Sequence, residues 1–540
     1  MRPHPSDDTE FEFGRLPVLT RRRLLAAAAG SAAALAFALD RPTRADAEVT
    51  GGSFSSDPFR LGVASGDPLE TGVVIWTRLA PRPFEPFGGV PPDSAVSVDW
   101  QVATDENFTA VVRSGTATAH PEYAFTVHVD VRGLLPATEY FYRFRAGGQV
   151  SPVGRTRTTP VPSTTNMSLS FAFASCSSFN AGYFDATGHM ADEDVDVIFF
   201  LGDYIYEYPL TVEGSLRVDP PDMPSDFSTE TGSLSRYRLQ YAAHKSEPEL
   251  IRAHQVAPWI VTWDDHEVVD GYAYVDPADP ANADFLVRRA NAYRAYWEHM
   301  PLRAPQAPVG PDARLYRSLD YGKLARFHML DDRQYRRPHL TATSIPDSPE
   351  RRSTDRTMLG DEQEAWFLRS LTTSTARWNL VPQGVLMSMF DIDDTANRLF
   401  SAGGWDAYQA SQQRVLDTVA DNDVSNFVVF TGDVHRNYVL DMHADTDDPD
   451  SPIVGAEFVG TSLTSGSDGT DSDAGLELRY RANPHLHWGS LQRGYVRGRL
   501  SQDLMTVDYR EVPYVTRHGA PVYTKRSFAV EAGRPGIQDA

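Results

Sequence analysis

Four apolar runs in this chain each stop just before a side chain that can bind a metal ion. The runs and the residues that follow them are 169–174 before Cys176, 196–201 before Asp203, 259–263 before Asp264, Asp265 and His266, and 426–431 before Asp433 and His435. Near-continuous apolar runs are typical of strands that are buried on both faces of a sheet. Ligands of open α/β sheets bind beyond the carboxyl ends of the strands. A single Gly-Asp would be ordinary turn chemistry, but four such ends predict one crevice lined by these side chains.

Cys176 is the only cysteine, so the chain cannot form an internal disulfide. It is therefore a small buried apolar side chain, a metal ligand or a nucleophile, and its place among the other strand ends favours the ligand. Carboxylates suit Ca²⁺, Mg²⁺ or Mn²⁺, whereas a thiolate, an imidazole and a phenolate together suit a transition metal such as Fe³⁺. Tyr206 can supply the phenolate, and Asp203 can bridge two metal ions. Two adjacent metal ions can clamp a phosphoryl group and generate hydroxide at usable pH.

Residues 49–160 have a different pattern, which consists of short alternating runs typical of an all-β region. Apolar and polar residues alternate within the runs at 96–102, 125–131 and 139–145, and Pro- and Gly-containing turns separate these runs. A Leu-Pro-x-Thr-x-Tyr-x-Tyr stretch is typical of a fibronectin-III-like strand pair. Residues 160–165 have the composition of a linker. We therefore predict an N-terminal all-β sandwich domain at 48–160 and an α/β catalytic domain at 167–525. The catalytic domain should contain helices near 363–371 and 408–419.

Residues 1–47 have the features of an export signal. Arg21, Arg22 and Arg23 precede an alanine-rich apolar run at 26–39 and a small-x-small sequence at 45–47. The run is short for a membrane-spanning helix and is interrupted at Asp40. We predict a twin-arginine signal peptide, recognised by the twin-arginine translocase, and a secreted protein, with the periplasm or cell wall as other destinations. A basic cytoplasmic tail is the alternative, but it would not need the small-x-small sequence. The translocase carries folded proteins, often with a cofactor already bound, which suits a metalloprotein.

The charge and the absent motifs exclude several classes of function. The formal net charge is −23, which repels nucleic acids at long range, so no stable nucleic-acid partner is expected. Such acidity suits a protein that binds divalent cations, although it equally keeps a secreted protein soluble. The α/β region has no Gly-x-Ser-x-Gly elbow and no Gly-rich phosphate loop with a Lys. The first absence counts against a serine hydrolase, and the second counts against a nucleoside triphosphatase.

Several longer motifs occur in order along the chain. They are Phe-Arg-Leu-Gly-Val-Ala-Ser-Gly-Asp-Pro at 59–68, Val-Ile-Trp-Thr-Arg-Leu-Ala-Pro at 74–81, Phe-Leu-Gly-Asp-Tyr-Ile-Tyr-Glu at 200–207, Trp-Asp-Asp-His-Glu-Val at 263–268, Tyr-Trp-Glu-His-Met-Pro-Leu-Arg at 296–303, Gly-Asp-Val-His at 432–435 and Glu-Phe-Val-Gly-Thr-Ser at 457–462. Together they resemble the PhoD-type alkaline phosphatases. The resemblance extends over residues 57–512. It implies the calcineurin-like metallophosphoesterase fold, a β-sandwich flanked by helices, which is related to that of the purple acid phosphatases.

The resemblance also implies a set of metal ligands for an iron ion and a calcium ion. Fe³⁺ would be held by Cys176, Asp203, Tyr206 and His435. Asp203 would bridge to Ca²⁺, with Asp265 and Asp433 on the calcium side. The related superfamily usually has Asp-x-His after the first strand and Gly-His-x-His at the last one, so Cys176 and the Gly-Asp-Val-His sequence are departures from that pattern.

The same resemblance implies catalysis by direct attack of a metal-bound hydroxide on phosphorus. His266 would face the phosphate or the leaving group, and Arg333 would stabilise the charge on the phosphoryl oxygens. A structural salt bridge with a neighbouring Asp is the alternative for Arg333. Gln383 and His485 are weaker candidates for the crevice, and His299 is expected to pack within a helix.

The predicted function is an exported phosphatase that acts on phosphomonoesters and phosphodiesters. Its partners would be small phosphate esters or phospholipids, and the protein is expected to be a monomer. A phospholipase-D-like phosphodiesterase would use the same residues, so the motifs leave that alternative open. A secreted binding protein with an inactive phosphatase fold is a third reading, and the complete set of ligand residues argues against it.

Overall fold

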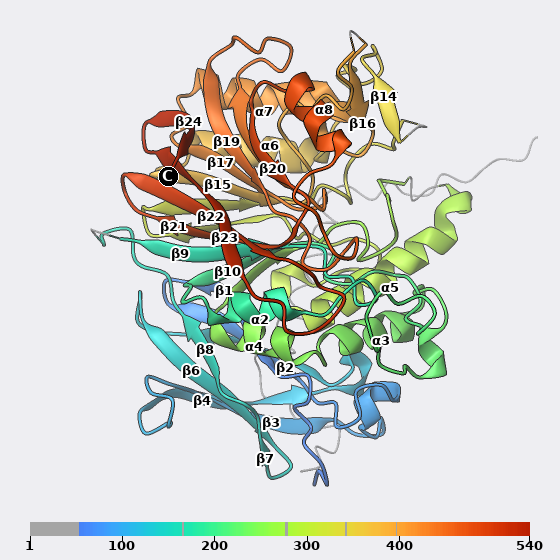
Figure 1. The fold of residues 1–540 in the computed structure, drawn as a ribbon. Helices are drawn as coiled ribbons and strands as arrows, with labels where there is room; N and C mark the ends of the chain where they lie inside the picture. Colours follow the sequence, from blue (N-terminus) through green and yellow to red (C-terminus); the bar gives the residue numbers. More distant parts are fainter. Residues whose placement is uncertain (1–52, 165–166, 276–278, 341–342, 396) are drawn as a thin grey trace, which may run out of the picture. The chain divides into compact units, whose positions relative to one another are not determined.

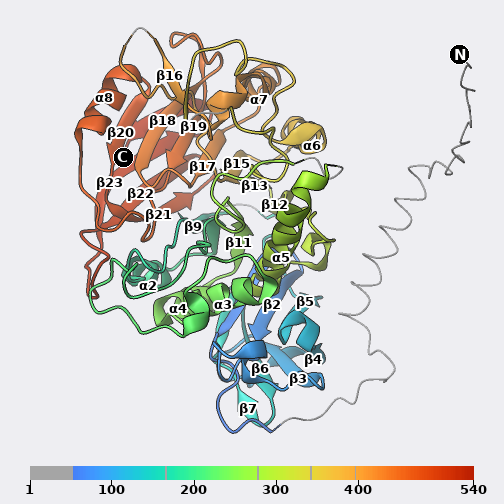
Figure 2. The same cartoon turned by 90° about the vertical axis from the view of Figure 1, so that its right-hand side faces the viewer.

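The computed structural model describes residues 53–164, 167–275, 279–340, 343–395 and 397–540 (Figures 1 and 2). The predicted signal peptide lies outside these residues. All of the described residues belong to one compact unit. No helix within the described ranges combines the length and the apolar character needed to cross a membrane.

A ten-stranded sheet carries three of the four predicted strand ends. Its strands, in spatial order, are β24 (Arg534–Asp539), β23 (Tyr523–Glu531), β22 (Leu504–Val512), β21 (Arg493–Leu500), β9 (Leu169–Ala174), β10 (Val197–Leu201), β11 (Trp259–Thr262), β1 (Val63–Leu69), β2 (Gly72–Arg78) and β5 (Thr126–Arg132). Strands β9, β10 and β11 run parallel to one another. Their carboxyl ends therefore lie on one edge of the sheet.

A seven-stranded sheet carries the fourth predicted end. Its spatial order is β12 (Arg317–Tyr321), β13 (Ala325–Met329), β15 (Trp378–Gln383), β17 (Phe427–Thr431), β19 (Ile453–Val459), β18 (Asn437–His443) and β20 (Leu486–Ser490). Strands β13, β15, β17 and β19 are parallel. A separate pair, β14 (Ser344–Pro346) and β16 (Leu399–Ser401), forms a small antiparallel sheet.

The two large sheets pack face to face over an apolar core. Phe171 and Phe173 of β9 lie against Phe430 of β17, with ring centroids 5.1 and 4.9 Å from that of Phe430. The apolar runs of both sheets are buried throughout. Burial of this kind, at roughly 25 cal/mol per Å² of apolar surface, stabilises the sandwich.

Helices cover the outer faces of both sheets. The first group, α2 (Asp185–Asp192), α3 (Leu234–His244), α4 (Pro248–Val256) and α5 (Ala283–His299), shares a core with the outer face of β9–β11. The second, α6 (Gly360–Thr372) and α7 (Gln409–Asp421), packs on the outer face of β15 and β17. Another helix, α8 (Ala474–Ala482), contacts β20. The helices expected near 363–371 and 408–419 correspond to α6 and α7, and the layers form a β-sandwich flanked by helices (Figure 1).

The N-terminal region is built from β-strands, as the alternating pattern predicts, but its strands divide between two sheets. Strands β1, β2 and β5 extend the ten-stranded sheet, and β1 pairs with β11 in parallel at Gly66 and Trp259. The others, β3 (Val96–Ala103), β4 (Val111–Ala119), β6 (Glu139–Ala146), β7 (Gln149–Val150) and β8 (Gly154–Arg157), form a five-stranded sheet. An apolar core joins the two layers. One layer of this region is thus continuous with the sheet that carries the site.

Candidate metal centre

The loops that follow the parallel strands of both sheets are bonded to one another. The N–H of Cys176 donates to the carbonyl of Gly202, and the N–H of Ser177 donates to that of Asp203. Ser175 and Ser462 form an isolated parallel bridge that joins the two sheets at this edge. These contacts bring the ends of β9, β10 and β19 together, so the predicted crevice lies at the shared edge of the sandwich.

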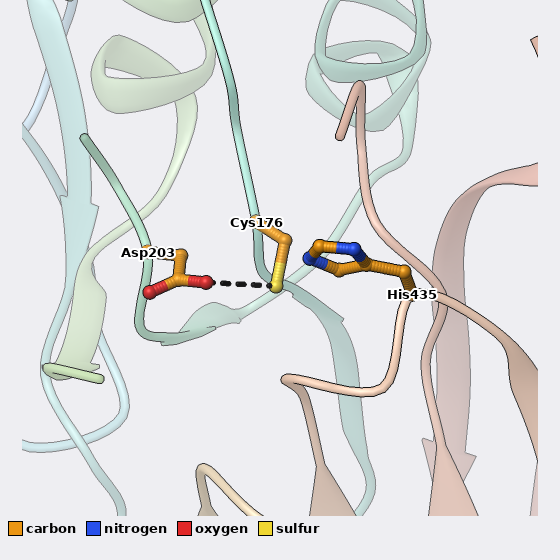
Figure 3. A group of neighbouring side chains, drawn as sticks. All are labelled: Cys176, Asp203 and His435. Atoms are coloured by element: carbon orange, nitrogen blue, oxygen red, sulfur yellow. Dashed lines mark hydrogen bonds between the residues drawn. The ribbon is translucent and has the colours of Figure 1, made fainter. Parts of the chain in front are cut away.

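A first cluster, the thiol group, consists of Cys176, Asp203, Tyr206 and His435. One atom each of the cysteine, aspartate and histidine lie within 4.8 Å of one another, and the three side chains point toward a common centre (Figure 3). The Cys176 thiol donates to Asp203 Oδ2 at 3.5 Å. The Tyr206 hydroxyl also donates to that oxygen at 3.0 Å and lies 3.1 Å from His435 Nε2. Four different donor atoms thus face one small volume.

Burial sets the protonation of the thiol group. Burial and then the Asp203 carboxylate raise the pKa values of the Cys176 thiol and the Tyr206 phenol well above their ordinary values. Burial lowers the pKa of His435 to about 4, so its imidazole is neutral. A neutral imidazole can bind a metal directly, whereas the thiol and the phenol become strong ligands when a cation displaces their protons.

Four of the predicted ligands have left-handed backbone conformations. The φ angles are 60° for Cys176, 53° for Asp203, 58° for Asp433 and 56° for His435. Non-glycine residues in this region cost about 1–3 kcal/mol each and cluster at functional sites. The turn before Asp203 also needs Gly202, because a Cβ there would lie 2.4 Å from Cβ of Asp264. The chain therefore accepts local strain in order to aim these side chains inward.

A second cluster, the carboxylate group, consists of Asp264, Asp265 and Asp433. One oxygen of each lies within 4.8 Å of the other two, and Asp265 is also grouped with Asp203 and His266. Asp203 is thus close to both clusters, as a bridging ligand must be. The Oδ2 atom of Asp264 is buried and has no hydrogen-bond partner. Asp264 was not among the ligands implied by the family resemblance.

Arg333 is buried beside the carboxylate group and forms ion pairs with all three of its members. Its Nη2 lies 2.6 Å from Asp433 Oδ1, its Nη1 lies 3.5 Å from Asp265 Oδ2, and its Nε donates to Asp264. Burial alone would raise the pKa of Asp265, but Arg333 and His266 lower it to about 2. The Arg333 guanidinium thus forms its salt bridges with the carboxylates of the site. The neighbouring Asp331 instead accepts a hydrogen bond from the backbone N–H of Arg333.

His266 is held at the side of both clusters. Its Nδ1 lies 2.7 Å from Glu207 Oε2, and its ring packs on those of Tyr206 and Tyr208, with centroids 4.2 and 5.5 Å away. Burial lowers the pKa of His266, but the surrounding carboxylates, Asp203 first, outweigh it and raise the pKa to about 10. His266 is therefore positioned with one nitrogen fixed and a positive charge beside Asp203.

Three buried residues that position the site were not predicted. Glu267 accepts the backbone N–H groups of Asp203 and Asp264, at 2.9 and 2.8 Å, and that of Tyr204 at 2.6 Å. Arg493 donates to the carbonyl oxygen of His435 at 2.8 Å. Glu207 orients His266. Both glutamates directly follow predicted site residues, in Tyr206-Glu207 and His266-Glu267, and that adjacency was the available signal.

The weaker candidates lie outside the two clusters. Gln383 is fully buried and bonds to Thr431 and Trp405. The Nε2 of His485 lies 2.7 Å from the carbonyl oxygen of Met389. His299 is the last residue of α5 and contacts Arg78, so it is a packed helix residue, as predicted.

Comparisons with known proteins identify the family to which the chain belongs. Residues 171–509 match the family model of PhoD-like phosphatases, and residues 44–160 match that of the PhoD-like phosphatase N-terminal domain. Alkaline phosphatase D of Bacillus subtilis (strain 168) is 44% identical over 492 residues, which cover 90% of this chain and 83% of that protein. A solved structure of PhoD has 43% identity and a TM-score of 0.86, covering 91% of this chain and 93% of that one. The resemblance indicated by the motifs is confirmed, and the chain belongs to the PhoD-like phosphatase family and is a phosphoric ester hydrolase.

Proposed function

We propose that this phosphatase is metal-dependent, with Fe³⁺ in the thiol group and Ca²⁺ in the carboxylate group, and that it hydrolyses both phosphomonoesters and phosphodiesters. The observation that carries the proposal is the mixed set of donors at the strand ends, where a thiol, a phenol, an imidazole and a carboxylate face one volume. No simple structural role requires these four side chains to be buried together.

The chemistry of each cluster fits its proposed ion. Thiolate, phenolate and imidazole ligands suit a transition metal, and a phenolate suits ferric iron in particular. Three carboxylates suit the harder calcium ion. The unpartnered, buried Oδ2 of Asp264 supports a cation at the carboxylate group, because a buried carboxylate oxygen without a partner is costly.

Bound metal ions would supply Lewis-acid polarisation of the phosphoryl oxygens and a nucleophile from water at usable pH. The side chains contribute positioning and charge. Arg333 lies among Asp264, Asp265 and Asp433, where its guanidinium can meet the negative phosphoryl group. His266 has its Nδ1 fixed by Glu207, which leaves Nε2 to donate a proton to the departing alcohol oxygen.

We further propose that the protein is exported through the twin-arginine translocase and acts outside the cytoplasm as a monomer. The arginine-rich start, the apolar run and the small-x-small sequence within residues 1–47 support export. Export after folding would let the protein acquire iron before it leaves the cytoplasm. Fractionation of cells that express the wild type or a variant with Arg22 and Arg23 replaced by Lys tests this proposal.

The activity is tested with three substrates: p-nitrophenyl phosphate, bis-p-nitrophenyl phosphate and phosphatidylcholine. We expect hydrolysis of the first two in the presence of calcium, and loss of activity after chelation. Hydrolysis of phosphatidylcholine would favour the phospholipase alternative. Inactivity on all three, with iron and calcium measured in the protein, would contradict the proposal.

A further inference from the structure

A pocket of about 430 Å³ lies beside the thiol group. Its walls include the buried Phe179 and Leu210 and the exposed Leu216, and it reaches Tyr206 and Tyr208. None of the side chains that line it is charged, although the chain as a whole has a net charge of −23. A pocket of this composition suits an uncharged, largely apolar group.

Exposed apolar side chains are concentrated in the segment 208–218, two of whose members, Tyr208 and Leu216, line this pocket. Thirteen large apolar or aromatic residues are exposed among the described residues, and four of them fall between 208 and 218. These four are Tyr208, Val212, Leu216 and Val218, which are 46–55% exposed. Single exposed apolar residues are common, but a cluster of them at a pocket indicates a ligand-binding surface.

The wall formed by residues 209–217 is fixed to the rest of the protein. Asn180 donates to the carbonyl of Pro209 at 2.8 Å, and its own carbonyl accepts the N–H of Leu216 at 2.7 Å. Arg217 stacks on Phe179 with 3.9 Å to the ring centroid, and it forms an ion pair with Glu247. The wall is therefore already in place for a ligand, and binding requires little further ordering.

The pocket borders the candidate metal centre through two tyrosines. Tyr206 lines the pocket, and its hydroxyl donates to Asp203 Oδ2 at 3.0 Å. Tyr208 also lines the pocket, and its ring packs against His266. Gln240 fixes this segment by donating to the carbonyl oxygens of both tyrosines, at 2.5 and 3.1 Å. The two tyrosines that line the pocket therefore also pack against His266, the residue proposed to protonate the departing alcohol.

We propose that this pocket is a subsite for the alcohol part of the phosphate ester, and that it selects esters of bulky apolar alcohols over esters of small polar ones. The inference rests on the proposed function, because it assumes that the ester is cleaved between the two clusters. Leu216 is the specificity-determining residue, since it adds exposed apolar surface to the pocket and is not itself one of the metal-capable side chains.

The test compares kcat/KM for 2-naphthyl phosphate and glycerol 3-phosphate. Because each variant is compared with the wild type on both substrates, the different reactivities of the two alcohols cancel. Leu216→Asn should lower the naphthyl-to-glycerol ratio by about three- to tenfold, as expected for part of an apolar contact. Leu216→Met should retain the ratio. Leu135→Asn, which alters an even more exposed leucine away from this pocket, should also retain it.

The outcomes separate the subsite from the activity. If the wild type and Leu216→Asn hydrolyse both esters with the same ratio, the subsite is refuted and the proposed function stands. If the wild type, with its metals measured, hydrolyses neither ester, the proposed function fails and the subsite fails with it. A fall of the ratio in Leu135→Asn equal to that in Leu216→Asn would also refute the subsite, because the effect would not be local.

Discussion

Replacing Glu267 by Gln should weaken the iron site without removing any ligand. The Glu267 carboxylate is fully buried and accepts three backbone N–H groups, two at Oε2 and one at Oε1. Two of these N–H groups belong to Asp203 and Tyr204, which follow β10, and the third belongs to Asp264, which follows β11. Glu267 therefore fixes the turn that aims Asp203 with a φ of 53°.

The free-energy cost of the substitution follows from the number of hydrogen-bond acceptors on each side chain. The Gln side chain has a single acceptor oxygen, which can replace Oε2 and keep its two bonds. The amide nitrogen then replaces Oε1 and faces the N–H of Tyr204, so one buried N–H has no acceptor. Leaving such a group unpaired costs about 1–3 kcal/mol. If the turn relaxes to avoid this cost, the same free energy is lost from iron binding, which corresponds to roughly 5- to 150-fold in affinity.

Glu457→Gln provides the matched control. Glu457 is also fully buried, and it accepts from the N–H groups of Met387 and Ser388 and from the Thr431 hydroxyl. It bonds to none of the metal-capable side chains. We expect both variants to lose about 1–3 kcal/mol of the free energy of unfolding in urea titrations, but only Glu267→Gln to lose bound iron and activity on p-nitrophenyl phosphate. Equal iron contents in the two variants and the wild type would refute this account of Glu267.

Four further predictions concern single substitutions. Cys176→Ser should lower the iron-to-protein ratio measured by elemental analysis, because a hydroxyl is a poorer ligand than a thiolate. Tyr206→Phe should abolish a visible phenolate-to-iron charge-transfer band, and a colourless, iron-free but fully active wild type would contradict that ligand. Arg333→Met removes the ion-pair partner of the buried Asp264 and Asp265 and of the partly exposed Asp433, and should destabilise the protein by about 3–5 kcal/mol in calcium-free buffer; added calcium should restore much of this loss in thermal unfolding. Burial lowers the pKa of Lys245 to about 7. Between pH 7 and about 10.4, the unfolded chain therefore binds one proton more at this lysine than the folded chain does. The free energy of unfolding of the wild type should accordingly rise with pH over this range. In Lys245→Met that rise should be smaller by about 5 kcal/mol, and parallel pH profiles of the two proteins in denaturant titrations would contradict the shift.

Much of the catalytic core could be predicted because its information is local. An apolar run such as 197–201 indicates a buried strand by itself, and the residue after it must lie at the strand end. The parallel arrangement then brings Cys176, Asp203 and Asp265 to one edge without further knowledge of the fold. The predicted helices at 363–371 and 408–419 were similarly recognisable from their own sequences.

The features of the fold and the site that could not be predicted depend on contacts between residues that are distant in the sequence. Strand β1 contains Gly66 and Pro68, which usually indicate a turn, and a single parallel pairing of Gly66 with Trp259 joins it to β11. An alternating strand such as β5 carries no sign of which sheet it will join. The partners of Arg333 are 69 and 100 residues away from it. Neither relation leaves a pattern in one sequence.

The two clusters differ in what an entering cation must displace. In the carboxylate group, Arg333 forms ion pairs with all three aspartates, so a cation that bound there would compete with a buried guanidinium for their charge. In the thiol group, Arg493 bonds to the backbone carbonyl of His435 and leaves the donor atoms to each other. An ion there displaces only the protons of Cys176 and Tyr206, which requires a strongly polarising cation. If the two proposed ions bind, iron should therefore be held more tightly than calcium, because competition with Arg333 weakens binding only at the carboxylate group.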